Sequence, residues 1–261
     1  MEHIFRNCLI TLFDQPQANI GDILRLLNDD NYRREAIGCV ESQRIKDFWQ
    51  KEYAKYSYRF RADSIAPIQN KVGAFMANPV IYGILCEAKT NLSFRTAMDT
   101  GQAILVNLSK GKLGEDASSL LGSLLMTSVG LAAFSRANVP EDEREDFALY
   151  ADEFQNFTTL SLVNMASELR KYHVGLVLAN QYLDQIEMEI RQAVLGNVGT
   201  LIAFRLGAAD AVHLEKEFHP TFNRYDLLNL PNHHIYIKLM IDGKPSKPFS
   251  AATLPANGIA V

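Results

Sequence analysis

The sequence is poor in cysteine and has no excess of positive charge. Its 261 residues include three cysteines, Cys8, Cys39 and Cys86, and carry a formal net charge of −4. The odd number and wide separation of the cysteines exclude a zinc site of the usual spacing and indicate reduced thiols, as in cytosolic proteins. The negative net charge excludes a protein that binds nucleic acid because its whole surface is basic. It leaves open binding through a local basic patch or through the pore of a ring.

The sequence also lacks a clear targeting or membrane segment. Its first residues, Met1–Arg6, carry no secretory signal. One uncharged stretch, residues 118–134, is interrupted by serine, threonine and glycine and is short for crossing a bilayer. We therefore expect this stretch to be a helix packed closely under a sheet, in a cytoplasmic chain without a membrane segment.

Residues 1–98 have the pattern of helices throughout. Apolar side chains recur at helical spacing with charged residues between them, most clearly over residues 41–58. Basic and aromatic side chains interleave from residue 51 to residue 61, which suits contact with nucleic acid or, more often, a helix that is half core and half solvated. We expect an all-helical subdomain here, with no catalytic residue in it.

From residue 99 onward, short apolar runs alternate with helical patterns. The runs expected as strands are 103–108, 147–151, 174–179 and 200–204, and the expected helices are 118–134, 158–172, 183–194 and 208–218. This alternation is typical of right-handed parallel crossovers in a doubly wound α/β sheet. In the tail, residues 234–239 and 247–251 are strand-like runs, and Asp242-Gly243 between them predicts a β-hairpin. We expect residues 99–261 to form one α/β core.

The loop Ser109–Gly114 joins the first expected strand to the first expected helix of this core. Its glycines and lysines are typical of a loop that holds a phosphate. It lacks the Gly-Lys-Ser or Gly-Lys-Thr that such a loop requires, so we favour a tight basic turn, with a DNA phosphate contact as the weaker alternative.

Polar side chains follow three of the expected strands at the point where each strand ends. They are Asp152 and Glu153, then Gln181, then Arg205. Parallel strands bring their carboxyl ends to one edge of the sheet, where open α/β proteins bind ligands. A carboxylate for magnesium, a second carboxylate or amide for the attacking water, and a cation for developing charge are the groups that phosphoryl transfer needs. The alternatives are an Asp that begins a turn and a Gln that caps the next helix.

Arg170 lies at the end of the expected helix 158–172, between two of these strands. An arginine in this position can act on the site of a neighbouring subunit, as an arginine finger does. It can equally be a surface arginine at the carboxyl end of a helix, where the helix dipole favours a cation. Position alone does not separate the two readings.

The segment Leu149–Phe157 resembles the Walker B segment of the FtsK/HerA superfamily of hexameric DNA-pumping ATPases. More narrowly, Ser167–Tyr172 and Leu178–Tyr182 resemble the finger helix and the glutamine motif of the TraG/TraD-like coupling proteins of conjugation and type IV secretion. The resemblance implies a RecA-like, mainly parallel sheet with a helical subdomain attached. It also implies ATP and Mg²⁺ as cofactors, and DNA as a partner in the pore of a hexamer.

The resemblance also implies a role for each strand-end residue. Asp152 would bind magnesium through water, and Glu153 would activate the hydrolytic water. Gln181 would contact the γ-phosphate, Arg170 would serve the neighbouring subunit, and Arg205 would be a second basic group. The implied setting is the cytoplasm, at the inner face of a bacterial membrane where partners place it, with relaxase or secretion components as further partners.

The sequence departs from this family in one respect. No Gly-Lys-Ser or Gly-Lys-Thr of a P-loop occurs in it. The chain therefore resembles the carboxyl-terminal portion of a motor, with an incomplete sheet whose unpaired edges favour association with copies of itself or with the missing P-loop portion. We expect weak or no ATP hydrolysis by the chain alone. The alternatives are a non-catalytic module that binds DNA or partner subunits, and an unrelated doubly wound protein.

Overall fold

The computed structural model describes residues 1–87 and 92–254. Residues 88–91, which fall in the predicted helical region, and the last seven residues lie outside this description. The chain forms two compact units: a helical unit, Met1–Leu92 with Leu108–Leu121, and a mixed unit, Ser93–Asn107 with Gly122–Val261. The predicted domain boundary at residues 98 and 99 stays a prediction. The predicted α/β class is confirmed.

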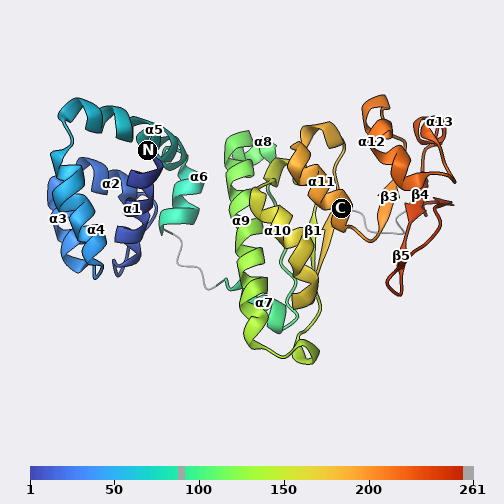
Figure 1. Cartoon of the computed structure of the whole chain (residues 1–261), viewed down its shortest axis with the longest axis horizontal. Helices are drawn as coiled ribbons and strands as arrows, with labels where there is room; N and C mark the ends of the chain where they lie inside the picture. Colours follow the sequence, from blue (N-terminus) through green and yellow to red (C-terminus); the bar gives the residue numbers. More distant parts are fainter. Residues whose placement is uncertain (88–91, 255–261) are drawn as a thin grey trace. The chain divides into compact units, whose positions relative to one another are not determined.

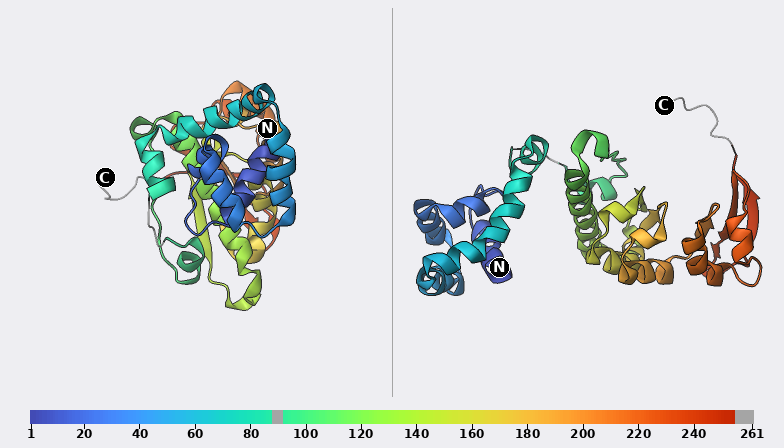
Figure 2. Two further views of the ribbon diagram at one scale, coloured as in Figure 1. Left: turned by 90° about the vertical axis from the view of Figure 1, so that its left-hand side faces the viewer. Right: turned by 90° about the horizontal axis from the view of Figure 1, so that it is seen from above.

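The described part of the helical unit contains helices and turns and no strand (Figures 1 and 2). Its helices are α1 (Glu2–Phe13), α2 (Asp22–Asn28), α3 (Asp30–Cys39), α4 (Gln43–Asp47), α5 (Tyr58–Met76), α6 (Pro79–Tyr82), α8 (Lys110–Leu113) and the first turns of α9 (Glu115–Ser135). Two π-helical turns, Phe48–Glu52 and Gly83–Glu87, extend α4 and α6.

The core of the helical unit is built around buried aromatic residues. Trp49 is 3% exposed and donates its indole N–H to the Thr11 hydroxyl over 2.8 Å, so its polar edge is satisfied inside the core. Tyr53 is 1% exposed, and the guanidinium groups of Arg33 and Arg61 lie 5.3 and 4.7 Å from its ring centre. Tyr58, by contrast, is 90% exposed. This part of the basic and aromatic stretch is therefore divided between core and solvent.

The mixed unit holds all the strands of the described chain (Figure 1). Its elements are α7 (Phe94–Asp99), the rest of α9, β1 (Phe147–Ala151), α10 (Leu160–Glu168), β2 (Val174–Leu178), α11 (Met188–Asn197), β3 (Leu201–Ala203), α12 (Ala208–Phe218), α13 (Arg224–Leu228), β4 (His234–Lys238), β5 (Met240–Ile241), β6 (Lys244–Pro245) and β7 (Phe249–Ala252). Strand β1 and helix α12 have the predicted bounds, and β2 ends one residue before the predicted end at residue 179. The helix predicted at 183–194 is shifted toward the carboxyl end, to Met188–Asn197.

Strands β1 and β2 form a two-stranded parallel sheet, with Phe147 opposite Val174 and Ala151 opposite Leu178. The face that carries these residues packs against α9, α10 and α11 in one hydrophobic core. The other face is open, and Tyr150 is 74% exposed. A doubly wound sheet has helices on both faces, so the expected second layer over this strand is wrong for the described chain. An unbroken apolar run is what a doubly covered strand requires, but it cannot show that a second layer is present.

Helix α9 packs closely in this core because two of its residues have no side chain. A Cβ atom on Gly122 would overlap the ring of Phe157, and one on Gly130 would lie 2.9 Å from the sulfur of Met165. Residues 115–138 are long and apolar enough to cross a membrane by length and composition, and an apolar stretch of 18 residues within them is 44% buried inside the protein. The tight contacts support the predicted role as a helix under a sheet.

The predicted strand 103–108 is not a strand. Residues 103–107 have no regular secondary structure, and Leu105 and Val106 are 98% and 52% exposed. An extended apolar run becomes a strand only when a neighbour accepts its backbone hydrogen bonds. No described strand pairs with this segment, and a sequence pattern cannot supply that partner.

A second sheet follows, with the order β3–β4–β7, and it is antiparallel throughout. The expectation that the run 200–204 joins the parallel sheet is therefore wrong for β3, which pairs with β4 in the opposite direction. The predicted hairpin is confirmed, since its two runs contain β4 and β7, which pair antiparallel. Between them the short strands β5 and β6 pair across Asp242 and Gly243, whose φ angles are 50° and 75°. Positive φ at both positions is what a tight hairpin turn of this kind requires.

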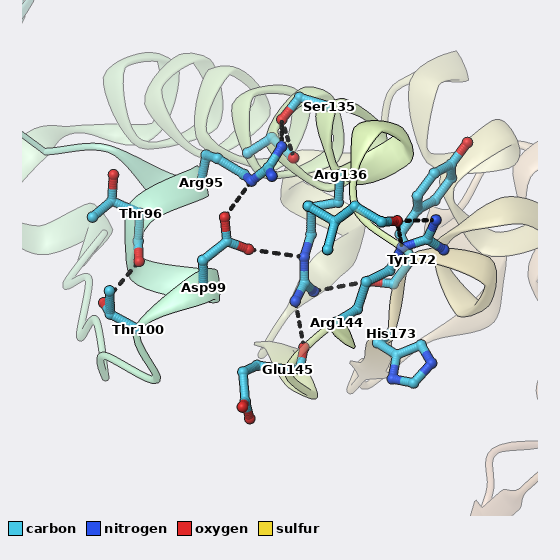
Figure 3. A network of polar contacts seen from close by, with 12 residues as sticks. Arg95, Thr96, Asp99, Thr100, Ser135, Arg136, Arg144, Glu145, Tyr172 and His173 are labelled. Atoms are coloured by element: carbon cyan, nitrogen blue, oxygen red, sulfur yellow. Dashed lines mark hydrogen bonds and ion pairs between the residues drawn. The ribbon is translucent and has the colours of Figure 1, made fainter. Parts of the chain in front are cut away.

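A buried arginine links four segments of the mixed unit (Figure 3). Arg136 is fully buried and follows α9 directly. Its guanidinium donates to the carbonyl oxygens of Tyr172 (2.8 Å) and Glu145 (2.6 Å), and its Nε lies 3.1 Å from Asp99 Oδ1 at the end of α7. Paired in this way, the buried cation holds together the segments that lead into β1 and β2.

Candidate functional site

The chain makes a tight turn where β1 ends. Glu153 adopts a left-handed conformation, with φ 50° and ψ 42°, which is uncommon for a residue with a side chain. Three hydrogen bonds support the turn: the Glu153 amide donates to Asp152 Oδ1, and both the backbone and the side-chain amide of Asn156 donate to the Glu153 carbonyl, all at 3.0 Å. Strained backbone held this firmly is common at functional sites.

The structure brings Glu153 and Gln181 together. Gln181 Nε2 donates to Glu153 Oε1 over 2.5 Å, and Gln155 Nε2 donates to Glu153 Oε2 over 2.5 Å. The ladder between β1 and β2 continues beside this contact, because Phe154 N–H donates to the Ala179 carbonyl over 3.0 Å. Both carboxylate oxygens are thus held in fixed positions at the carboxyl edge of the parallel sheet, while Gln181 is exposed and Glu153 is half-buried.

Asp152 is exposed beside this contact and uses one oxygen, Oδ1, for the turn. No group of three or more His, Cys, Asp or Glu side chains that could hold a metal occurs in the described residues. A single carboxylate with waters and phosphate oxygens is nevertheless how Mg²⁺ is held in many nucleotide sites. The buried Oε1 of Gln155 has no hydrogen-bond donor among the described residues, and a water bound at this edge would satisfy it. These residues fit the magnesium and water side of such a site.

Arg170 is not close to this edge. It lies exposed in the 3₁₀ turn Leu169–Tyr172, directly before the amino end of β2, whereas Gln181 follows the carboxyl end. Five residues of strand separate the two ends by about 17 Å. The structure therefore does not bring Arg170 to Glu153 of its own chain, and its role towards a neighbouring subunit stays a prediction.

Arg205 does not follow a strand of the sheet that carries the contact between Glu153 and Gln181. It is exposed and follows β3, which belongs to the antiparallel sheet rather than to the β1–β2 pair. We expected a third parallel strand to place Arg205 at the same edge of the sheet, and this expectation is wrong. Its role as a second basic group stays a prediction that the strand order does not support.

Two site residues, Gln155 and Asn156, were not predicted. Gln155 fixes the second oxygen of Glu153, and Asn156 holds the Glu153 carbonyl. A signal was present in the sequence, since two amides follow a strand-end carboxylate by two and three residues, where a turn can fold them back.

The loop Ser109–Gly114 is a short helix, α8, followed by Gly114, and Lys110 pairs with Glu115 at 3.0 Å.

No family model and no curated protein matches the sequence. Solved structures of the plasmid coupling protein TrwB do match the fold. The complex with the ATP analogue ADPNP matches with a TM-score of 0.57 at 13% identity, and the complex with ADP and Mg²⁺ with 0.57 at 14%. The trigonal form with sulphate, described as a bacterial conjugative coupling protein, matches with 0.58 at 15%.

Each of these matches covers 96% of this chain and 68% of the TrwB chain. Both the helical unit and the mixed unit therefore have counterparts in TrwB. At this level of identity the match concerns the fold, and it agrees with the resemblance that the sequence motifs carry. This chain has the fold of the bacterial conjugative coupling protein TrwB.

Proposed function

We propose that this chain is part of a hexameric ATPase that moves DNA in conjugative transfer or type IV secretion. The observation that carries the proposal is the 2.5 Å contact between Gln181 and Glu153 at the carboxyl edge of two parallel strands. The TrwB structures add support, because that protein shares the fold and is described in complex with ADPNP and with ADP and Mg²⁺.

Each residue has a role in this proposal. Asp152 holds Mg²⁺ through water, Glu153 orients and deprotonates the attacking water, and Gln181 contacts the γ-phosphate. Arg170 serves the site of a neighbouring subunit, and Arg205 is a more distant basic group. When bound, magnesium neutralises charge on the β- and γ-phosphate oxygens.

The chain supplies only one side of such a site. The backbone N–H groups and the lysine that hold the phosphates in P-loop proteins come from a Gly-Lys-Ser or Gly-Lys-Thr loop, which this sequence does not contain. These groups must come from another polypeptide segment. The complete site therefore belongs to a larger assembly.

The proposal is tested by mapping where a nucleotide-bound metal lies on the chain. Millimolar Mn²⁺ with ADPNP replaces the magnesium complex, and its paramagnetism broadens the NMR signals of nearby amides. We expect broadening at residues 151–156 and 179–181 and its loss in Asp152→Asn, whereas Asp142→Asn, an exposed acid in the turn Glu141–Glu143, keeps it. Broadening that is centred on other residues, or that persists in Asp152→Asn, refutes the proposed site.

A second function, a non-catalytic module that binds DNA, is favoured by a pocket in the helical unit. The pocket has a volume of about 640 Å³ and is lined by four basic residues, Arg6, Arg44, Lys51 and Lys55, and two acidic ones. Lys51 is paired with Asp47 at 2.9 Å, while Arg44 and Lys55 are exposed and have no ion-pair partner in the described chain. The half-buried Tyr56 and the edge of the buried Phe48 also line the pocket, and basic residues beside an accessible aromatic side chain suit a phosphate backbone with its bases.

Binding of a labelled single-stranded oligonucleotide, followed by fluorescence anisotropy at several salt concentrations, tests this second function. The double variant Arg44→Ala/Lys55→Ala should bind several-fold more weakly and with a smaller dependence on salt. Lys46→Ala, in the same helix as Arg44 but outside the pocket, is the control. Equal binding by all three proteins excludes this pocket as the DNA site.

A further inference from the structure

The loop that carries Gln181 is held on both sides of this residue. On one side, Ala179 continues the ladder with β1 through its amide and its carbonyl. On the other side, the Leu183 amide donates to Asp210 Oδ1 over 3.1 Å. Only residues 180–182 lie between these two attachments. The second attachment therefore limits where the side chain of Gln181 can be placed.

Asp210 is buried, although it is charged. It lies in the first turn of α12 and is 5% exposed. A buried carboxylate is costly unless it accepts hydrogen bonds, and the Leu183 amide donates one to it. The amino end of a helix also favours a negative charge. Asp210 therefore acts as a fixed acceptor for the loop rather than as a solvated surface acid.

A second contact from the same helix reaches the next residue of the loop. His213 Nε2 lies 3.0 Å from Asp184 Oδ1, and Arg191 of α11 donates to the same oxygen over 2.8 Å and to the Leu183 carbonyl over 3.3 Å. The pKa of Asp184 is lowered, first by the hydrogen bond with His213 and then by that with Arg191, because both stabilise the carboxylate. Positions 210 and 213 are three residues apart in α12, so both side chains project from one face of the helix.

We propose that Asp210 and His213 are positioning residues for Gln181. They hold the loop at Leu183 and Asp184, so that the Gln181 side-chain amide meets Glu153 Oε1 over 2.5 Å. The meaning of this contact for catalysis rests on the proposed ATPase function, in which Gln181 contacts the γ-phosphate.

The proposal gives the antiparallel sheet a part in the site. Helix α12 packs with Ala203 of β3 and Tyr236 of β4 in a hydrophobic core of its own. The contacts of Asp210 and His213 therefore tie the carboxyl edge of the parallel sheet to an element that packs on the antiparallel sheet. A geometry held from outside the reacting groups is how an enzyme keeps them in register.

NMR of the side-chain amides, recorded without nucleotide, tests the proposal. A glutamine Nε2 proton that is hydrogen-bonded to a carboxylate resonates downfield of a free one, and Glu153→Ala gives the free position for Gln181 and for Gln155. We expect Asp210→Ala and His213→Ala to move the Gln181 proton toward that free position. The Gln155 proton, which is bonded to Glu153 Oε2, should stay where it is. A general loosening of the turn at Glu153 would move both.

Two further variants serve as controls. Asp210→Asn keeps an oxygen that can accept the Leu183 amide, so it should restore the wild-type signal of Gln181. Glu217→Ala removes the ion pair with Lys238, at 3.2 Å, from another part of α12 and should leave that signal unchanged. If Asp210→Ala does not fold, His213→Ala decides the question, because the side chain of His213 is 34% exposed.

Three outcomes overturn the proposal: a Gln181 signal that stays in place in the alanine variants of Asp210 and His213, one that moves together with the Gln155 signal, and one that Glu217→Ala moves as much. A Gln181 signal that does not respond to Glu153→Ala also overturns it, because the contact is then absent in solution. No nucleotide is present, so these outcomes concern the positioning alone. The ATPase function is judged separately, by the manganese experiment.

Discussion

Gln181 Nε2 lies 2.5 Å from Glu153 Oε1, which joins the ends of two neighbouring parallel strands by one side-chain hydrogen bond. The second carboxylate oxygen is occupied by Gln155 at the same distance. A carboxylate fixed at both oxygens is already oriented before any substrate binds. This preorganisation is what a water-activating group needs.

The first prediction concerns hydrolysis by the isolated chain. Because the sequence contains no Gly-Lys-Ser or Gly-Lys-Thr, nothing in it matches the loop that holds the β- and γ-phosphates in P-loop enzymes. We expect weak or no magnesium-dependent ATP turnover, measured as phosphate release with the Glu153→Gln variant as the blank. Robust turnover that disappears in Glu153→Gln would contradict this expectation while supporting the role of the residue.

The second prediction concerns the close packing of α9. Gly122→Ala forces a methyl group into the ring of Phe157 and should lower the free energy of unfolding by about 1–3 kcal/mol. Gly196→Ala in α11 is the matched control, because a Cβ there meets nothing within 4 Å. The control should raise stability by about 0.5–1 kcal/mol through helix propensity.

These values are measured by urea unfolding followed by circular dichroism, because the single tryptophan, Trp49, lies in the helical unit and does not report on α9 packing in the mixed unit. Equal effects of the two alanine substitutions would show that α9 moves away from Phe157 without cost.

The third prediction concerns the buried arginine. Arg136→Ala removes the donors to the Tyr172 and Glu145 carbonyls and the partner of Asp99 (Figure 3). We expect a loss of about 3–5 kcal/mol in unfolding free energy, as for other buried ionic networks that lose one member. The exposed Arg170→Ala should change stability by no more than about 0.5 kcal/mol. A small effect of Arg136→Ala would mean that water replaces its hydrogen bonds.

The fourth prediction concerns acid. The pKa of Asp184 is lowered from its ordinary value of 3.8, first by the hydrogen bond with His213 and then by that with Arg191. A carboxyl group with a lowered pKa in the folded state stabilises the fold above its unfolded pKa, and this contribution is lost as the pH falls through the folded pKa. Asp184→Asn should therefore lower the urea midpoint at pH 7.

The difference between wild type and Asp184→Asn should then shrink as the pH is lowered below 3.8. The exposed Asp142→Asn serves as the control and should show no such trend. A difference that stays constant down to pH 2 would show that the Asp184 contacts with His213 and Arg191 are not maintained in solution.

Local patterns in the sequence predicted most elements of the fold. Helix α12 has the predicted bounds Ala208–Phe218, and β1 begins and ends where the apolar run does. These elements depend on side-chain periodicity and on the length of an apolar run, which the sequence contains directly. The contact between Glu153 and Gln181 was also expected, because a parallel pair needs only the order of two strands to bring its carboxyl ends together.

The larger errors concern long-range pairing. Residues 103–106 have strand propensity but no partner strand in the described chain, β3 pairs with a later strand instead of with β2, and Tyr150 faces solvent where a second layer was expected. Arg136 was overlooked because a single arginine after a helix has no distinctive pattern, and its three partners come from distant segments. Partners of this kind are decided by the folded chain as a whole.

The position of Asp99 has a consequence for the segment that follows it. Its carboxylate is held by both Arg136 and Arg95, and Ala103 comes four residues later, within about 14 Å even if the chain between them is fully extended. Although residues 103–106 have no regular secondary structure, their segment therefore begins close to a residue that is held in place by two arginines. The buried arginine that joins the segments before β1 and β2 thus also limits how far residues 103–106 can reach.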